Sequence, residues 1–227
     1  MTDTVLSETQ APHALCLRDE RGVVVADNCQ RWLGEAAAED ERLLDQAVGP
    51  VLDIGCGPGR HVLALARRGV DCLGIDVTPS AVHLARSRGA AVVEASIFHA
   101  VPRTGIWATG LLLDGNIGIG GDPVALLIRV ASVLRPRARI LLELGSPGTS
   151  GGSEVARVEH DTFRGPWFGW TIVEAAGIEM IAAEAGLKLE RLWSAGGRWF
   201  ARIDTPGQGF SALPPCDPVT GTKGKHV

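Results

Sequence analysis

The 227-residue sequence lacks several features that are typical of particular protein classes. It has no tyrosine, no C-x-x-C pair and only five scattered cysteines, which disfavours both a zinc site and a disulfide-built secreted scaffold. No apolar run approaches the ~20 residues that a bilayer-spanning helix needs, and the N-terminal stretch is polar. We therefore expect a cytoplasmic protein with reduced thiols, no membrane association and no metal.

A surplus of positive charge is also missing. Lys and Arg number 22 against 26 Asp and Glu, so the formal net charge is -4 at pH 7. A protein that binds nucleic acid usually carries a basic face, so this balance disfavours RNA or DNA as a partner. We expect a small-molecule partner instead, and the sequence does not indicate an oligomeric state.

What the sequence does contain is an alternation of short apolar runs with segments of helical periodicity. The pattern predicts an α/β fold with a parallel sheet and helices on both faces. The expected strands are 51–54, 71–75, 91–94, 107–113 and 139–144, and the expected helices are 60–68, 79–88 and 122–134. Thr78 and Asp122 each precede a proline and are expected to cap the helices that follow them.

The flanking segments have different patterns. Residues 14–26 indicate a β-hairpin and residues 35–48 a helix, while the C-terminal part indicates an exposed strand, a helix and two antiparallel strands, over 155–160, 174–185, 187–193 and 198–203. We therefore expect an N-terminal hairpin and helix cap over 1–47, a core over 48–204 with an insertion at about 146–172, and an irregular tail over 205–227.

The strongest local signal is VLDIGCGPGRHV, residues 51–62, where a buried strand leads through glycines into a helix. Gly55, Gly57 and Gly59 permit a tight turn and close approach of a ligand to the backbone, and the free N–H groups of the helix start favour an anionic group. Arg60 stands where a dinucleotide fingerprint has its third glycine, and no G-K-[ST] follows. The pattern therefore disfavours both a nicotinamide cofactor and a nucleoside triphosphate.

Two carboxylates follow neighbouring strands of this unit. Asp53 lies at the end of the first strand, where it can accept hydrogen bonds from loop N–H groups or from a ligand ammonium. Asp76 ends the second strand, where an acidic side chain can accept hydrogen bonds from both hydroxyls of a ribose.

Together, VLDIGCGPGR and GIDVTPSAVHLA resemble motif I and the acidic motif that follows it in class I S-adenosylmethionine-dependent methyltransferases, over roughly residues 48–145. The resemblance implies a doubly wound, Rossmann-like, seven-stranded mixed sheet of order 3-2-1-4-5-7-6. It also implies that Gly55, Cys56 and Gly57 surround the methionine part of S-adenosylmethionine, that Asp76 holds the ribose and that Val77 lies beside the adenine.

The same resemblance assigns roles further along the chain. Many members have an acidic residue after the third strand that contacts the adenine amine; here Ser96 stands there, so either its hydroxyl or the backbone N–H of Ile97 is expected to recognise the adenine edge. The loop after the fourth strand places Asp114 and Asn116 where cofactor and acceptor meet, although both residue types are common in turns. Arg60 can assist in holding the cofactor carboxylate.

The acceptor pocket is expected to come from segments outside the common core, namely 14–47 and the insertion. Trp167 and Trp170 are candidates for closing over a planar or apolar acceptor, with core packing as the alternative. His160 and Asp161 are candidate proton acceptors, and Asp114 and Asn116 are also candidates for a direct chemical role. A methyl transfer needs a base only when the acceptor must lose a proton.

We therefore expect methyl transfer from S-adenosylmethionine to an O, N or C atom of a small molecule. One alternative is a protein or RNA methyltransferase, which would need an exposed basic or extended groove. Another is a catalytically inactive module that binds S-adenosylmethionine.

Overall fold

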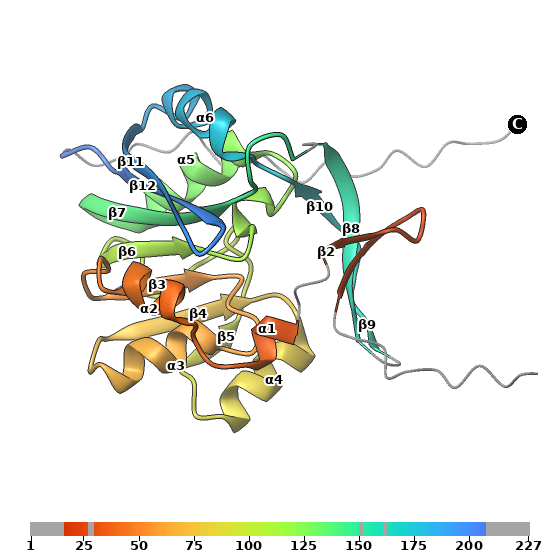
Figure 1. Ribbon diagram of the computed structural model, residues 1–227. Coiled ribbons are helices and arrows are strands. Elements are labelled where there is room, and N and C mark those ends of the chain that lie inside the picture. The colour runs from red at the N-terminus through yellow and green to blue at the C-terminus, as the bar shows by residue number, and fades with distance from the viewer. Residues whose placement is uncertain (1–15, 27–29, 150–151, 161–162, 208–227) are drawn as a thin grey trace, which may run out of the picture.

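The computed structural model describes residues 16–26, 30–149, 152–160 and 163–207. Within them the chain forms a seven-stranded sheet flanked by helices and a second, smaller sheet that stands beside it (Figure 1). The smaller sheet lies at the carboxyl ends of β3 and β4 of the larger one, and this arrangement defines the candidate site.

The larger sheet has the predicted order. Its strands are β3 (Val51–Ile54), β4 (Cys72–Asp76), β5 (Val92–Glu94), β6 (Trp107–Leu112), β7 (Leu134–Leu144), β11 (Lys188–Ala195) and β12 (Arg198–Asp204). They are arranged β11-β12-β7-β6-β3-β4-β5; β12 pairs in antiparallel fashion with both β11 and β7, and the other pairs of this sheet are parallel. With these seven strands numbered 1 to 7 along the chain, the order read from β5 to β11 is 3-2-1-4-5-7-6. This confirms the predicted fold class and strand order.

Helices cover both faces of this sheet. They are α2 (Ala38–Leu44), α3 (Arg60–Arg67), α4 (Pro79–Ser87), α5 (Pro123–Val133) and α6 (Ile178–Glu184). One apolar cluster joins Leu126 of α5 and Ile178 of α6 to the sheet, and another joins Leu43 of α2 and Val62 of α3 to the opposite face. The sheet is therefore buried on both sides, as its continuous apolar strands require.

Some local predictions differ from the structure. The Asp122 side chain caps α5 by accepting from the N–H of Ala125 at 2.9 Å, as expected, whereas the Thr78 side chain makes no capping hydrogen bond at α4. The helix expected over 35–48 is limited to α2, and that expected over 174–185 begins as a 3-10 turn, Ala175–Gly177.

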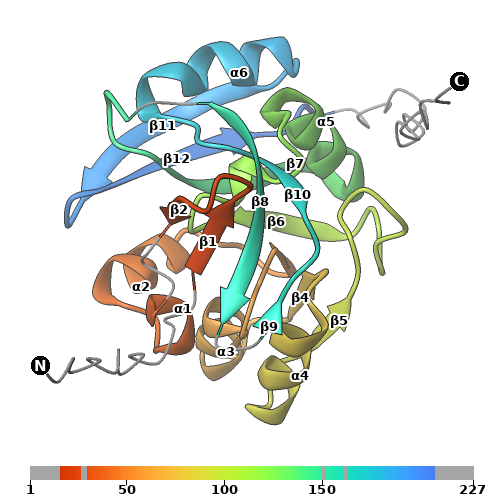
Figure 2. The same cartoon turned by 90° about the vertical axis from the view of Figure 1, so that its right-hand side faces the viewer.

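The smaller sheet is built from two distant segments of the chain. Its strands are β1 (Cys16–Asp19), β2 (Val24–Ala26), β8 (Ser153–His160), β9 (Phe163–Arg164) and β10 (Phe168–Thr171). The order is β10-β8-β1-β2, with β9 paired to β8. The predicted hairpin is present as β1 and β2, but its partner β8 comes from the insertion, so the two contributors expected separately form one sheet (Figure 2).

The short helix α1 (Gln30–Leu33), β9 and β10 were not anticipated from the sequence. The insertion has too few residues of regular alternation for its last strands to be recognised. In the described ranges, no helix has the length and hydrophobicity to cross a bilayer.

Candidate functional site

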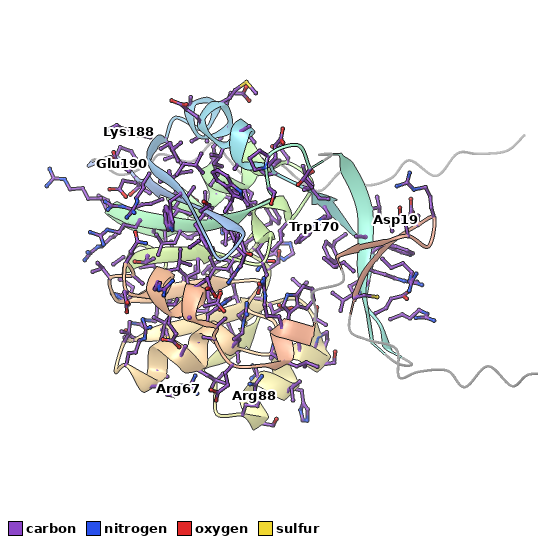
Figure 3. The ribbon with its side chains drawn as sticks, viewed as in Figure 1. Asp19, Arg67, Arg88, Trp170, Lys188 and Glu190 are labelled. Atoms are coloured by element: carbon purple, nitrogen blue, oxygen red, sulfur yellow. The ribbon has the colours of Figure 1, made fainter. Side chains whose placement is uncertain are left out.

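A cavity of about 470 Å³ lies between the carboxyl ends of β3 and β4 and the smaller sheet. Its volume is within the range of small-molecule and cofactor sites, and its place is the crevice where open α/β sheets bind ligands. Trp170 extends from β10 into the space between the two sheets (Figure 3). The lining includes these residues predicted from the sequence: Gly55, Cys56, Gly57, Arg60, Asp76, Val77, Ser96, Ile97, Asp114, Asn116 and Trp170.

The glycine loop between β3 and α3 forms one wall. Gly55, Gly57 and Gly59 all have positive φ, at 70°, 52° and 83°. A Cβ at Gly57 would meet no atom within 4 Å, whereas one at Gly59 would lie 2.8 Å from the Cβ of Ala90. Gly59 therefore allows α3 to pack closely, and Gly57 leaves open the space beside the cavity.

Asp76 supports this loop from the tip of β4. Its Oδ2 accepts a hydrogen bond from the N–H of Gly57 at 2.8 Å, and its Oδ1 accepts one from the N–H of Thr78 at 2.8 Å. Burial raises the pKa of Asp76, and the hydrogen bonds from Thr78 and Gly57 oppose that shift. The carboxylate thus joins the loop to the cavity wall, with lone pairs left for further donors.

The opposite end of the cavity is apolar with a few polar atoms. Val77 is 47% exposed at its rim, and Ile97 is buried in its wall. The Ser96 hydroxyl oxygen accepts from the N–H of Phe98 at 3.2 Å, which orders the turn after β5. Such a slot between apolar side chains suits a flat ring.

Asp114 follows β6 and is held by two arginines. Arg60 Nη2 donates to both of its carboxylate oxygens, at 2.8 and 2.7 Å, and Arg31 Nη2 donates to Oδ1 at 2.7 Å. Burial acts to raise the pKa of Asp114, but the charges of His61, Arg60 and Arg31 hold it below its ordinary value. Its backbone N–H donates to Glu143 Oε2 at 2.9 Å. Asp114 is thus an ion-pair partner and a weak proton acceptor.

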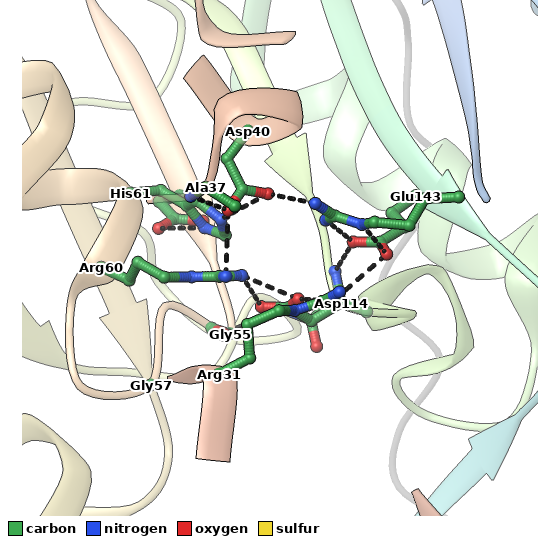
Figure 4. A network of polar contacts seen from close by, with 12 residues as sticks. Arg31, Ala37, Asp40, Gly55, Gly57, Arg60, His61, Asp114 and Glu143 are labelled. Carbon is green, nitrogen blue, oxygen red and sulfur yellow. Dashed lines mark hydrogen bonds and ion pairs between the residues drawn. The ribbon is translucent and has the colours of Figure 1, made fainter. Parts of the chain in front are cut away.

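The same network continues away from the cavity (Figure 4). Arg198 donates from Nε and Nη2 to the two oxygens of Glu143, at 2.8 and 2.6 Å, and from Nη1 to Asp40 Oδ1 at 2.7 Å. Arg60 Nη1 lies 3.0 Å from Asp40 Oδ2. Three arginines and three carboxylates thereby connect α1, α2 and α3 to the ends of β6, β7 and β12.

Asp53, predicted to contact the cofactor, is 1% exposed and is not among the residues that line the cavity. Its Oδ2 lies 3.8 Å from His61 Nδ1, and His61 Nε2 lies 3.8 Å from Asp40 Oδ1. Burial raises the pKa of Asp53 to about 6. Burial acts to lower the pKa of His61, but Asp40 and Asp53 raise it above its ordinary value. Asp53 therefore lies behind the wall and faces a residue that lines it.

Cys56 lines the cavity but is poorly suited to act as a nucleophile. Burial raises the pKa of its thiol, and the nearby carboxylates of Asp53 and Asp76 raise it further. Because the thiolate is the reactive form, this cysteine is a small neutral side chain at neutral pH.

The wall opposite the glycine loop is apolar and comes from the smaller sheet and α1. Trp170 is 6% exposed and its ring lies against Gly115, while Phe168 packs edge-on to it with the ring centroids 6.0 Å apart. Trp167, in contrast, does not line the cavity; it is 42% exposed and Arg157 lies over its ring. The rest of this wall is formed by Leu17, Trp32, Leu33, Ile119 and Val158.

Of the two candidate proton acceptors in the insertion, the structure describes only the backbone of one. The backbone of His160 pairs with Phe163 at the end of β8, and its side chain lies outside the described part of the chain. Asp161 also lies outside the described residues.

Sequence reasoning missed the partners that organise the site. Arg31, Asp40, Glu143 and Arg198 are far apart in the chain and no short motif contains them. The signal that was present is the position of Glu143 near the end of the fifth core strand, the edge where ligands bind. Trp32 lies in a single helical turn with no periodicity to mark it.

Residues 51–106 match the family model of a methyltransferase domain. This part of the chain, which contains the glycine loop and Asp76, is similar to a methyltransferase domain, and the strand order of the larger sheet agrees with that expected for class I methyltransferases.

Solved structures of similar fold include an S-adenosylmethionine-dependent methyltransferase from Bacteroides fragilis in complex with S-adenosyl-L-homocysteine. It has 23% sequence identity, covers 87% of this chain and 90% of its own, and gives a TM-score of 0.71. The 1,6-didemethyltoxoflavin-N1-methyltransferase from Burkholderia thailandensis has 16% identity, coverage of 79% and 83%, and a TM-score of 0.58. The CcbJ methyltransferase from Streptomyces caelestis has 13% identity, coverage of 75% and 89%, and a TM-score of 0.58.

Proposed function

We propose that this protein transfers the methyl group of S-adenosylmethionine to a small molecule with a flat, apolar part. The observation that carries the proposal is a continuous cavity whose walls are the glycine loop and Asp76 on one side and Trp32, Phe168 and Trp170 on the other. Two ligands can therefore lie in contact between a polar wall and an aromatic wall.

The residues fit the cofactor. Gly57 leaves space that a Cβ would fill, and Asp76 offers carboxylate lone pairs to ribose hydroxyls. Arg60 and His61 line the cavity, and within the described part of the chain Arg60 Nε is buried without a hydrogen-bond partner. Because a buried donor without a partner is costly, the Arg60 side chain is suited to the charged methionine end.

When bound, S-adenosylmethionine supplies an activated methyl group. The protein contributes position: the glycine loop, Asp76 and the Asp114–Arg60 pair hold one side, and the aromatic wall holds the acceptor and excludes water. Orientation of this kind can supply roughly 7–11 kcal/mol of a barrier. With Asp114 ion-paired, the described residues lining the cavity favour an acceptor that needs no strong base.

The similar enzyme from Burkholderia thailandensis was solved with bound 1,6-didemethyltoxoflavin, and this supports a small heteroaromatic acceptor here. The cavity supports the same choice, because about 470 Å³ accommodates a cofactor and a compact acceptor rather than a folded macromolecule. A protein or RNA substrate remains the alternative to be tested.

The cofactor assignment is tested by titrating S-adenosylhomocysteine calorimetrically into wild-type protein and two variants. Gly57→Val places a branched side chain in the glycine loop, at a φ of 52°, and we expect loss of measurable binding. Gly69→Val is the matched control: its φ is 70° and a Cβ there also meets no atom within 4 Å, but it does not line the cavity. It should carry similar strain and retain binding. Equal affinity in both variants, or heat only with NAD, would refute the assignment.

The acceptor class is tested with methyl-labelled S-adenosylmethionine. Label should transfer to members of a panel of small heteroaromatic amines and phenols, and not to unstructured peptides or total tRNA. Preferential labelling of either macromolecule would refute the proposed acceptor. Tight cofactor binding with no transfer to any member would instead favour an inactive binding module.

A further inference from the structure

The loop after β6 is docked onto β10 of the smaller sheet by direct backbone contact. The N–H of Gly120 donates to the carbonyl of Gly169 at 2.9 Å, and the hydroxyl of Thr171 donates to the carbonyl of Gly121 at 2.8 Å. A Cβ at Gly118 would lie 1.9 Å from the carbonyl oxygen of Thr171. No residue with a side chain fits there without displacing β10, so loop and strand form one unit.

The same loop is fixed to the cofactor wall by Asn116. Its Nδ2 donates to the carbonyls of Ile54 and Gly55, each at 2.9 Å. Two carbonyl partners require a donor, so the amide nitrogen faces the glycine loop and both of its protons are used. Gly55 permits this approach, because a Cβ there would lie 2.8 Å from Asn116 Nδ2.

We infer that Asn116 is a positioning residue. It fixes the distance between residues 54–57 of the glycine loop, the cofactor cradle, and the aromatic wall that holds the acceptor. The inference rests on the proposed function. Through Asn116, the glycine loop, the loop 115–121 and Trp170 form one chain of contacts, with Gly115 against the Trp170 ring and Ile119 bridged to the Trp170 backbone. Ordering of the glycine loop by a ligand is thereby passed to β10. Asn116 takes no proton in the reaction.

This role gives a physical reason for an asparagine at position 116. Displacement of about 1 Å between reacting groups can slow a reaction by about 100-fold. A single amide that spans two walls is one way to limit such displacement, because each of its two hydrogen bonds fixes the loop against the backbone rather than against a mobile side chain.

Hydrogen exchange with S-adenosylhomocysteine as the probe tests the inference without knowledge of the acceptor. In the wild type, the probe should slow exchange in the cradle, 54–57, and also in 115–121 and 168–171. In Asn116→Ala the cradle should still be protected at saturating probe, whereas protection of 168–171 should be lost. For an acceptor identified by the panel, kcat should fall by about 100-fold with less than a threefold change in its KM.

Asp122→Ala is the matched control, because it removes the cap at the far end of the same loop and leaves Asn116 intact. It should lower thermal stability and keep the protection of 168–171. If Asn116→Ala transmits protection as the wild type does, or if Asp122→Ala loses it equally, the positioning role is refuted. Absence of cradle protection in the wild type would instead refute cofactor binding itself.

Discussion

Replacing Arg198 by methionine should destabilise the protein far more than an ordinary surface substitution would. Arg198 is 13% exposed and makes three hydrogen bonds of 2.6–2.8 Å to Glu143 and Asp40. Methionine keeps the apolar stem but leaves two buried carboxylates without their shared cation. Removal of one partner of a buried ion pair costs about 3–5 kcal/mol. Because Arg31 and Arg60 still contact these carboxylates, we expect a loss at the lower end of this range, about 3 kcal/mol.

The matched control lies on the same strand. Arg202 is 29% exposed and pairs with Asp204, two residues away, so Arg202→Met should cost less than about 1 kcal/mol. Urea unfolding followed by circular dichroism measures both. With a slope of about 2–3 kcal/mol/M, the midpoint should move by roughly 1–1.5 M for Arg198→Met and by less than about 0.5 M for the control. Similar midpoints for the two variants would show that the network contributes no more than an exposed pair.

Two further predictions concern the site. Because burial raises the pKa of Asp53 from 3.8 to about 6, folding takes up a proton between these values and stability falls as pH rises through them. Asp53→Asn removes this loss, so its stability relative to wild type should increase by up to about 3 kcal/mol between pH 4 and pH 6.5; a constant difference across urea curves at several pH values would contradict this. Trp170→Ala should raise the acceptor KM roughly tenfold, about 1.4 kcal/mol of apolar contact, with unchanged affinity for S-adenosylhomocysteine. Trp167→Ala should leave the acceptor KM and the affinity for S-adenosylhomocysteine unchanged. If the two variants change the acceptor KM equally in steady-state kinetics, Trp170 does not contact the acceptor.

The sequence predicts the core of this fold well because its signals are local. Each core strand from β3 to β6 is a short apolar run next to a helix with an identifiable start, and the strand 51–54 agrees with β3 in both bounds. The predicted strand 139–144 is only the apolar second half of β7, because the charged residues before it gave no strand signal. The glycine loop and Asp76 were identifiable because the turn and the carboxylate are fixed by backbone requirements at strand ends.

The remainder depends on contacts between distant residues. Pairing of β1 with β8 joins Leu17 to Val158, and no periodicity within either strand specifies that partner. Asp53 looked available for a ligand from its position at a strand end, yet its side chain is directed to His61 behind the wall. Whether a polar side chain at such an edge faces the ligand or a buried partner is decided by packing, which a single sequence does not contain.

The two-part origin of the smaller sheet affects how the protein is made. Strand β1 is synthesised before β8, its antiparallel neighbour, which emerges from the ribosome more than a hundred residues later. The edge of β1 that does not face β2 must therefore wait for its partner while the intervening residues are made, and open strand edges are prone to aggregate. The glycine loop, proposed to hold the cofactor, can form from a contiguous stretch of chain. The smaller sheet, which carries the proposed aromatic wall, is complete only after β1 and β8 have paired.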